Sequence, residues 1–129
     1  MNLLERTKKN EGFESKPYQD HLGNWTFGHG LTWISESESA HIVVGRLRAN
    51  NKSLMAIYPW LSNHPQEVID VVVEMSYQMG VEGVNGFQKM WGAIQKYNYE
   101  LAAKEMLDSQ WSRQTPNRAK SLANIMSKQ

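Results

Sequence analysis

One short segment, residues 11–30, constrains the fold of this chain more than any other. Four glycines, Gly12, Gly23, Gly28 and Gly30, bracket aromatic and β-branched residues. This composition predicts a β-hairpin or a small meander over residues 17–34. The flanking residues have helical spacing instead, so the chain is predicted to be mainly helical with one small β element.

Helices are predicted over most of the remaining sequence. Residues 2–11 form the first, with Leu3, Leu4 and Thr7 on one stripe and Gly12 where a left-handed cap would fit. Ser35 and Glu38 make a capping box that opens a helix running to Asn50-Asn51. Further helices are expected over residues 52–58, 66–79 (ended by Gly80), 87–96, 98–110 and 116–127, the last with Thr115 as N-cap and Pro116 in its first turn.

These elements predict an α+β fold, mainly α, in a single domain over residues 1–129. A small N-terminal lobe with one β-hairpin, about residues 12–60, would join a C-terminal helical bundle of residues 65–129 plus helix 2–11. A length of 129 residues and a hydrophobic fraction of 40% are enough for an ordinary core. A cleft between two such lobes would be the natural ligand site.

Composition excludes several classes of function. Because the chain has no cysteine, disulfides, thiolate metal sites and thiol catalysis are excluded. No metal or cofactor is expected, since the histidines lack paired ligand spacing. Residues 88–129 hold seven Lys/Arg against three Asp/Glu, but their scatter among acidic residues indicates a solvated helix face, not a nucleic-acid groove. Neither a membrane-spanning run nor the apolar core of a secretory signal is found, so we expect synthesis in a cytoplasm and no membrane insertion.

Two carboxylates and one hydroxyl in the glycine-rich segment are candidates for acid–base chemistry. Glu11 lies at the negative end of the first predicted helix and on its inward stripe, and both effects favour the protonated carboxyl that a general acid needs. A glutamate that merely solvates the helix end is the alternative. Asp20 can equally make an Asx-turn, and Thr26 can be an ordinary strand residue. Gly28 and Gly30 indicate either close approach of another group to the backbone or a bulge.

Taken together, these residues resemble the phage-type lysozymes of the T-even phage lysozyme family, glycoside hydrolase family 24. The resemblance covers about two thirds of the chain, in the same order in both halves. Its most specific part is the six-residue run Gln114-Thr115-Pro116-Asn117-Arg118-Ala119. The other matching residues are Met1-Asn2, Glu11-Gly12, Tyr18, Asp20, Gly23, Thr26, Gly28, Gly30, Gln78-Met79-Gly80, Gly83-Val84, Gly86-Phe87, Ala102-Ala103, Ser109 and Trp111.

The resemblance implies a lysozyme-like fold and an activity. The family cleaves the β-1,4 bond between N-acetylmuramic acid and N-acetylglucosamine in bacterial peptidoglycan, with inversion, and so causes cell lysis. Glu11 would be the general acid, Asp20 would activate the attacking water, and Thr26 would hold that water. Four further positions face substrate in the family, and a family arginine pairs with the catalytic glutamate. The substrate-facing positions correspond to Thr32, Tyr77, Met90 and Glu105, and the arginine corresponds to Arg118.

Two other functions stay open at this point. A lytic transglycosylase needs only one glutamate, so the presence of Asp20 together with Thr26 disfavours it. A wall-binding or virion domain needs no catalytic residue, so the intact set of all three residues disfavours that function. The resemblance implies a monomer that acts on the host wall after a separate membrane-permeabilising protein releases it from the host cytoplasm.

The sequence also departs from the family. The segment after the hairpin is shorter, Leu31 replaces a histidine, and His29 lies between the two glycines, so we expect a reduced small lobe.

Overall fold

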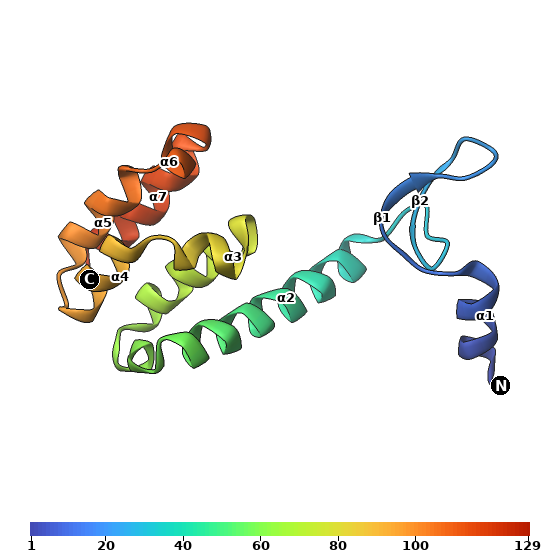
Figure 1. Ribbon diagram of the computed structural model, residues 1–129, viewed down its shortest axis with the longest axis horizontal. Helices are drawn as coiled ribbons and strands as arrows, with labels where there is room; N and C mark the ends of the chain where they lie inside the picture. Colours follow the sequence, from blue (N-terminus) through green and yellow to red (C-terminus); the bar gives the residue numbers. More distant parts are fainter. The chain divides into compact units, whose positions relative to one another are not determined.

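The computed structural model describes all 129 residues, which form two compact units, residues 1–42 and 43–129. The first unit contains α1 (Leu3–Glu11), β1 (Glu14–Gln19), β2 (Trp25–Gly28) and the start of α2 (Glu36–Ile57) (Figure 1). The second unit contains the rest of α2, η1 (Pro59–Asn63), α3 (Gln66–Asn85), α4 (Gln88–Gln95), α5 (Tyr99–Leu107), α6 (Gln110–Gln114) and α7 (Pro116–Ser127). The predicted α+β, mainly α fold with one hairpin is therefore confirmed. The assignment of helix 2–11 to the helical lobe stays a prediction.

Helix α1 begins with a capping box and ends abruptly at a glycine. The Asn2 side chain accepts a hydrogen bond from the Glu5 amide at 2.8 Å, and the Glu5 carboxylate accepts one from the Asn2 amide at 3.2 Å. Gly12 has φ 73 and ψ 180, so its φ is positive as predicted but its ψ is extended and not left-handed helical. The predicted stripe of Leu3 and Leu4 is exposed, so no buried face forms on α1 within residues 1–42.

The two strands form an antiparallel hairpin with an irregularity in β1. Tyr18 pairs with Thr26 near the turn and Glu14 pairs with Gly28 at the open end, with a register shift between the two pairs. Pro17 lies in the shifted stretch, which suits a residue that cannot donate to the ladder. The hairpin thus begins at residue 14, three residues earlier than predicted, because Glu14 still finds a partner across the sheet.

Helix α2 is one continuous helix, so the predicted break at Asn50-Asn51 is wrong. Its capping box is confirmed: the Glu38 amide donates to the Ser35 hydroxyl at 3.1 Å, and the Ser35 amide donates to the Glu38 carboxylate at 3.0 Å. An asparagine costs less than about 0.7 kcal/mol inside a helix. Burial of Leu54 and partial burial of Leu47, seven residues apart on one face, outweighs that cost.

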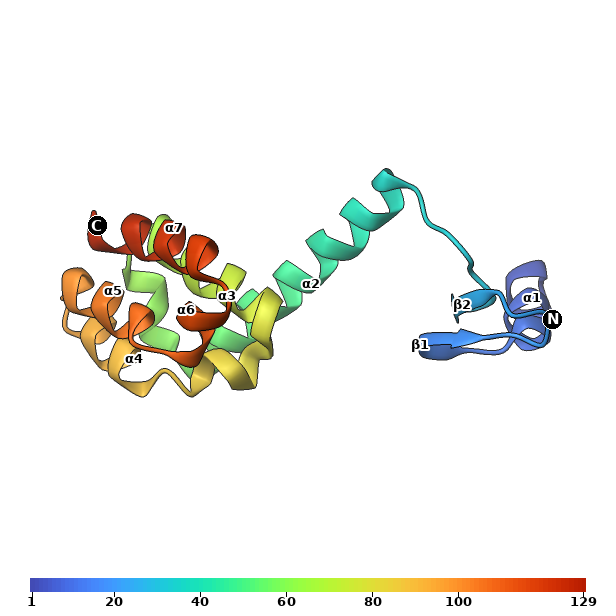
Figure 2. The same ribbon diagram turned by 90° about the horizontal axis from the view of Figure 1, so that it is seen from above.

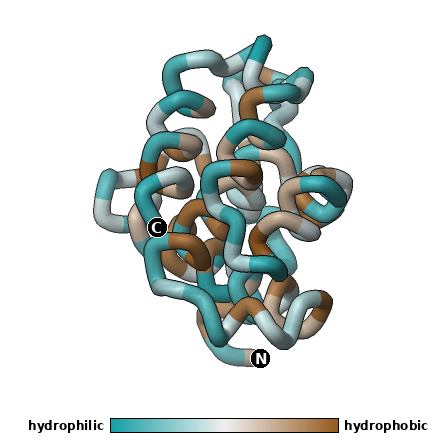
Figure 3. Tube along the Cα trace, turned by 90° about the vertical axis from the view of Figure 1, so that its left-hand side faces the viewer, coloured by the Kyte–Doolittle hydropathy of each residue, from teal (hydrophilic) through white to brown (hydrophobic).

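The core of the second unit is built around α3. Hydrophobic and hydrophilic residues alternate along the helices of this unit (Figure 3). Helix α5 lies against both α4 and α7 (Figure 2). Gly80 has φ 81 and ψ 162, so the helix breaks there as predicted, although a further helical stretch continues to Asn85. Trp91 and Trp111 are buried, and each indole N–H has a partner: the Val84 carbonyl at 2.9 Å for Trp91 and the Gln78 side chain at 2.8 Å for Trp111.

The C-terminal helices differ from the prediction in two details. The helix predicted over residues 98–110 ends at Leu107, and the short helix α6 follows because Ser109 caps it by accepting from the Ser112 amide at 3.1 Å. Thr115 does occupy the N-cap position of α7. Its hydroxyl, however, donates to the Trp111 carbonyl at 3.0 Å and makes no capping bond.

A cluster of aromatic rings holds η1 to the segment between α4 and α5. His64 is 7% exposed, lies 2.8 Å from the Tyr99 hydroxyl through Nδ1, and stacks on Tyr97 with ring centroids 4.5 Å apart. Trp60 meets His64 edge-on at 5.5 Å. Tyr97 adopts φ 60, a conformation that is unfavourable for a bulky residue, so the surrounding contacts must offset that strain.

Burial lowers the pKa of His64 below its ordinary value near 6.5. The folded protein therefore binds a proton at His64 more weakly than the unfolded chain does. The contribution of the neutral His64 side chain to stability is complete above pH 6.5 and is lost as the pH falls through the lowered pKa. We predict that the melting temperature falls between pH 7 and pH 5, and that His64→Gln flattens this fall.

The exposed His41 on α2 provides the matched control, because His41→Gln should keep the wild-type pH dependence. A His64→Gln variant whose melting temperature still falls as steeply as that of the wild type would contradict the prediction.

Candidate functional site

Glu11, the last residue of α1, lies against the backbone of Gly30. A Cβ atom added at Gly30 would lie 3.0 Å from Glu11 Cδ and closer still to Oε2, so only glycine fits beside this carboxyl. Of the two alternatives for Gly30, a close approach and a bulge, the structure shows a close approach, and the approaching group is Glu11. The partial burial expected for Glu11 is not found, since its side chain is exposed.

Gly30 belongs to a tight turn that follows β2. Phe27 and Leu31 exchange two backbone hydrogen bonds of 2.8 Å, and the three residues between them form the tip. Gly28 and Gly30 have φ values of 58 and 74, and His29 lies between them. A Cβ at Gly28 would meet Leu31 Cδ1 at an ordinary 3.5 Å, so Gly28 is required for its conformation, whereas Gly30 is required for both conformation and space.

Asp20 closes the hairpin turn, so the Asx-turn interpretation is confirmed. Its Oδ1 atom accepts the amides of Leu22 and Asn24, each at 2.9 Å. The Asn24 amide is the main reason that the pKa of Asp20 is lowered; the Leu22 amide and the charge of His21 lower it further, against an opposing effect of burial. Asp20 is therefore ionised at neutral pH. Because both of these bonds end on Oδ1, the Oδ2 atom can accept a proton or a hydrogen bond from a water.

Thr26 lies on the same face of the hairpin as Asp20. Tyr18 is directly opposite Thr26, and Asp20 follows Tyr18 by two residues, so the alternation of side chains places all three on one face. Thr26 is only 5% exposed, and its hydroxyl donates to the Asn24 carbonyl at 3.2 Å. Since that bond uses the hydroxyl proton, the oxygen lone pairs can accept from a water.

The backbone of Asn24 joins the two candidate residues, and our sequence analysis did not identify it. Its amide bonds to Asp20, and its carbonyl accepts from both the Asp20 amide and the Thr26 hydroxyl. The available signal was an asparagine in a turn, four residues after an aspartate and two before a threonine. This arrangement holds a proton acceptor beside a hydroxyl, while Glu11 supplies a carboxyl from α1. A proton donor and a proton acceptor are what acid–base hydrolysis requires.

The other predicted site residues are distributed over both units. Thr32 is exposed in the segment after β2, in the same unit as Glu11. Tyr77 is exposed on α3, and Arg118 is exposed in the first turn of α7. Within its own unit, then, each of these three side chains can reach a ligand.

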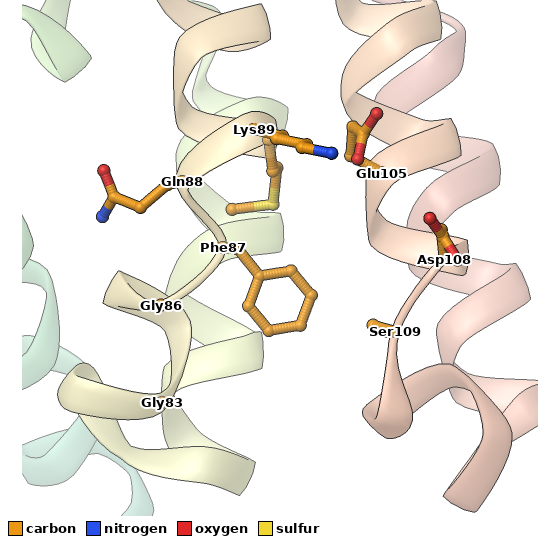
Figure 4. A pocket seen from close by; sticks show the side chains of 9 residues that line it. Gly83, Gly86, Phe87, Gln88, Lys89, Glu105, Asp108 and Ser109 are labelled. Carbon is orange, nitrogen blue, oxygen red and sulfur yellow. The ribbon is translucent and has the colours of Figure 1, made fainter.

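Met90 and Glu105 line one open hollow of ≈ 480 Å³ between α4 and α5. Lys89 and Glu105 point toward each other from the two helices, and the ring of Phe87 points toward Ser109 (Figure 4). Met90 is 0% exposed and belongs to the hydrophobic core, whereas Glu105 is half-buried. Glu105 can therefore contact a ligand through its side chain, while Met90 supports the floor of the hollow.

No group of three histidine, cysteine, aspartate or glutamate side chains is placed to hold a metal ion. None of the helices combines the length and the apolar character needed to cross a membrane.

Comparison with known proteins gives two matches. The family model described as "Phage lysozyme" matches residues 8–127. A Dictyostelium discoideum protein named "Probable T4-type lysozyme 1" is 35% identical to this chain over 77 residues. That alignment covers 60% of this chain and 44% of the relative, so the matched region spans less than half of the relative's length.

The contact between Glu11 and Gly30 predicts a specific loss of stability. Gly30→Ala adds both backbone strain, about 1 to 2 kcal/mol for a left-handed residue, and a collision with the Glu11 carboxyl. Gly23→Ala, at φ 83 with nothing within 4 Å, adds the strain alone. We predict that Gly30→Ala lowers the free energy of unfolding, measured by urea denaturation, by more than Gly23→Ala does.

A second substitution isolates the collision. Glu11→Ala should recover the difference between the two glycine variants when it is combined with Gly30→Ala. Equal losses for both glycine variants would show that the Glu11 side chain does not rest on Gly30.

Proposed function

Because this chain belongs to the phage lysozyme family, we propose that it is a peptidoglycan hydrolase that cleaves the β-1,4 bond between N-acetylmuramic acid and N-acetylglucosamine. The observation that carries this proposal is the grouping of Glu11, Asp20 and Thr26 within residues 1–42. Asn24 joins Asp20 to Thr26, and Glu11 rests on Gly30. Hydrolysis of a glycosidic bond needs two carboxyl groups of this kind, one donating and one accepting a proton.

Glu11 acts as the general acid in this mechanism. Its carboxyl is exposed at the end of α1, where it can reach the oxygen of the glycosidic bond. Protonation of that oxygen allows the sugar to leave as an alcohol while positive charge develops on the ring of the other sugar. Because Gly30 has no side chain, the Glu11 carboxyl can rest on the loop backbone, which restricts the positions available to it.

Asp20 and Thr26 act on the water that attacks the anomeric carbon. The ionised Asp20 accepts the proton of this water, and its lowered pKa keeps it ionised over the neutral pH range. The Thr26 hydroxyl accepts a second hydrogen bond from the same water. Attack by this water on the face opposite the leaving group inverts the anomeric configuration.

The substrate-binding roles of Thr32, Tyr77 and Glu105 remain part of the proposal. Glu105 is supported by its position in the hollow between α4 and α5. Met90 is assigned only an indirect role, because its side chain is buried. The pairing of Arg118 with Glu11 stays a prediction.

We further propose that the partner of this protein is the peptidoglycan of a bacterial wall, which it degrades as a monomer and so lyses the cell. In this proposal it accumulates in the host cytoplasm until a separate protein permeabilises the membrane. The support is the family membership, because its description assigns the family to phages.

Replacing the acid tests the role of Glu11. Glu11→Gln keeps the size of the side chain but cannot donate the proton, so we predict that turnover of purified bacterial walls falls by about 10² to 10⁴ or more. Melting temperature and wall binding should stay close to those of the wild type. Glu82→Gln, the same change at an exposed site on α3, serves as the control. Substantial lysis by Glu11→Gln would remove Glu11 from the mechanism.

Analysis of the released sugars separates the possible reactions. An inverting hydrolase leaves a reducing end that appears first as the α-anomer, visible by rapid NMR before mutarotation, because a single water attacks the β-linked sugar. Prompt appearance of the β-anomer would make Asp20 a nucleophile. Anhydro sugar ends in mass spectrometry would indicate a transglycosylase, and the absence of any cleaved product would indicate a wall-binding domain.

A further inference from the structure

A pair of aromatic rings closes the open end of the hairpin next to Glu11. The rings of Phe13 and His29 have centroids 5.1 Å apart and an interplanar angle of 47°. This separation lies within the range of about 4.5 to 7 Å that aromatic pairs prefer. Phe13 follows Glu11 by two residues, and His29 immediately precedes Gly30. The pair therefore connects the two segments that meet at the Glu11 carboxyl.

The strand register explains why these two rings meet. Glu14 and Gly28 are the last paired residues of the sheet, so the next position outward on each arm is Phe13 on one side and His29 on the other. One step farther lie Gly12 and Gly30, which have no side chains and have positive φ values. Neither glycine can hold the arms together by side-chain packing. The ring pair thus lies one residue beyond the last pair of the sheet and one residue before the two glycines.

The exposure of Phe13 indicates that its role is not to fill a core. Its side chain is 61% exposed, and α1 and the hairpin contain no large buried hydrophobic side chain against which it could pack. His29, at the tip between two glycines, is half-buried. The backbone bonds between Phe27 and Leu31 close the tip, and Gly28 and Gly30 add no side-chain restraint to it. The contact of His29 with Phe13 adds a side-chain restraint that links the tip to the segment after α1.

We propose that Phe13 and His29 are positioning residues whose ring contact holds the 28–30 tip against the end of α1 and so fixes the Glu11 carboxyl over Gly30. This inference rests on the proposed role of Glu11 as the general acid. A proton donor must lie within hydrogen-bond reach of the leaving oxygen. A displacement of roughly 1 Å can lower a catalytic rate by about 10²-fold, so loss of the rings should reduce kcat.

Four substitutions test this role in the intact protein. We expect Phe13→Ala and His29→Ala each to lower kcat on soluble peptidoglycan fragments by about 10- to 100-fold, with KM nearly unchanged. Phe13→Tyr and His29→Phe preserve a ring pair and should restore most of kcat. His41→Ala removes an exposed histidine from α2 in the same unit and should behave as the wild type does. The Phe13→Ala/His29→Ala double variant should be no slower than the slower single variant, because both changes break one contact.

A structural readout keeps the inference testable whatever the activity is. In NMR spectra of the wild type, a nuclear Overhauser effect is expected between the Glu11 γ-protons and the Gly30 α-protons, and it should weaken in both alanine variants while the melting temperature shows that they stay folded. An inactive wild type with this pattern would overturn the proposed function alone. The positioning role is overturned if the alanine variants keep the wild-type kcat, or if the Glu11–Gly30 effect persists in them at full intensity.

Discussion

The abrupt change from helix to strand at Gly12 is the constraint on which the arrangement of the first unit depends. A residue with φ 73 and ψ 180 lets the chain leave α1 and enter β1 within two residues, and Gly12 adopts this conformation without the backbone strain that a residue with a Cβ would incur. As a result, the last residue of α1 lies beside the open end of the hairpin that follows it. The contact of Glu11 with Gly30 follows from this geometry, because Gly30 is on the returning arm.

Asp20 combines a structural and a chemical role in one side chain. Its Oδ1 atom holds the turn through two backbone amides, and the same bonds lower its pKa. A carboxylate held in this way is a weaker base, but it is ionised at neutral pH and oriented by the turn, which suits the placement of the attacking water. The turn and the site therefore do not compete for this residue; the turn uses one oxygen and leaves the other available.

The second unit contributes a rigid helical body. Its buried side chains come from every long helix, and the hollow between α4 and α5 lies on the surface of this core. The distinction between Met90 and Glu105 shows how the core limits a binding surface. These two residues, both predicted to face substrate, border the same hollow, yet only the half-buried carboxylate can meet a ligand, because the methionine side chain is used in packing.

Local features of this protein were readable from its sequence because they depend on residues close together in the chain. The capping box of Ser35 and Glu38, the break at Gly80 and the Asx-turn at Asp20 are decided by spacings of a few residues, and the structure contains each of them. The family signature, likewise, depends on residue identity and order alone.

Contacts between distant residues were decided only by the tertiary structure. Nothing in the spacing shows that the ring of Phe13 meets the ring of His29, that Glu11 is exposed, or that α2 continues through Asn50-Asn51. These outcomes depend on which groups the strand register brings together and on how much apolar surface the packed helices bury. Each such contact contributes a free energy of roughly 1 kcal/mol or more, which exceeds the local conformational preferences that a sequence pattern records.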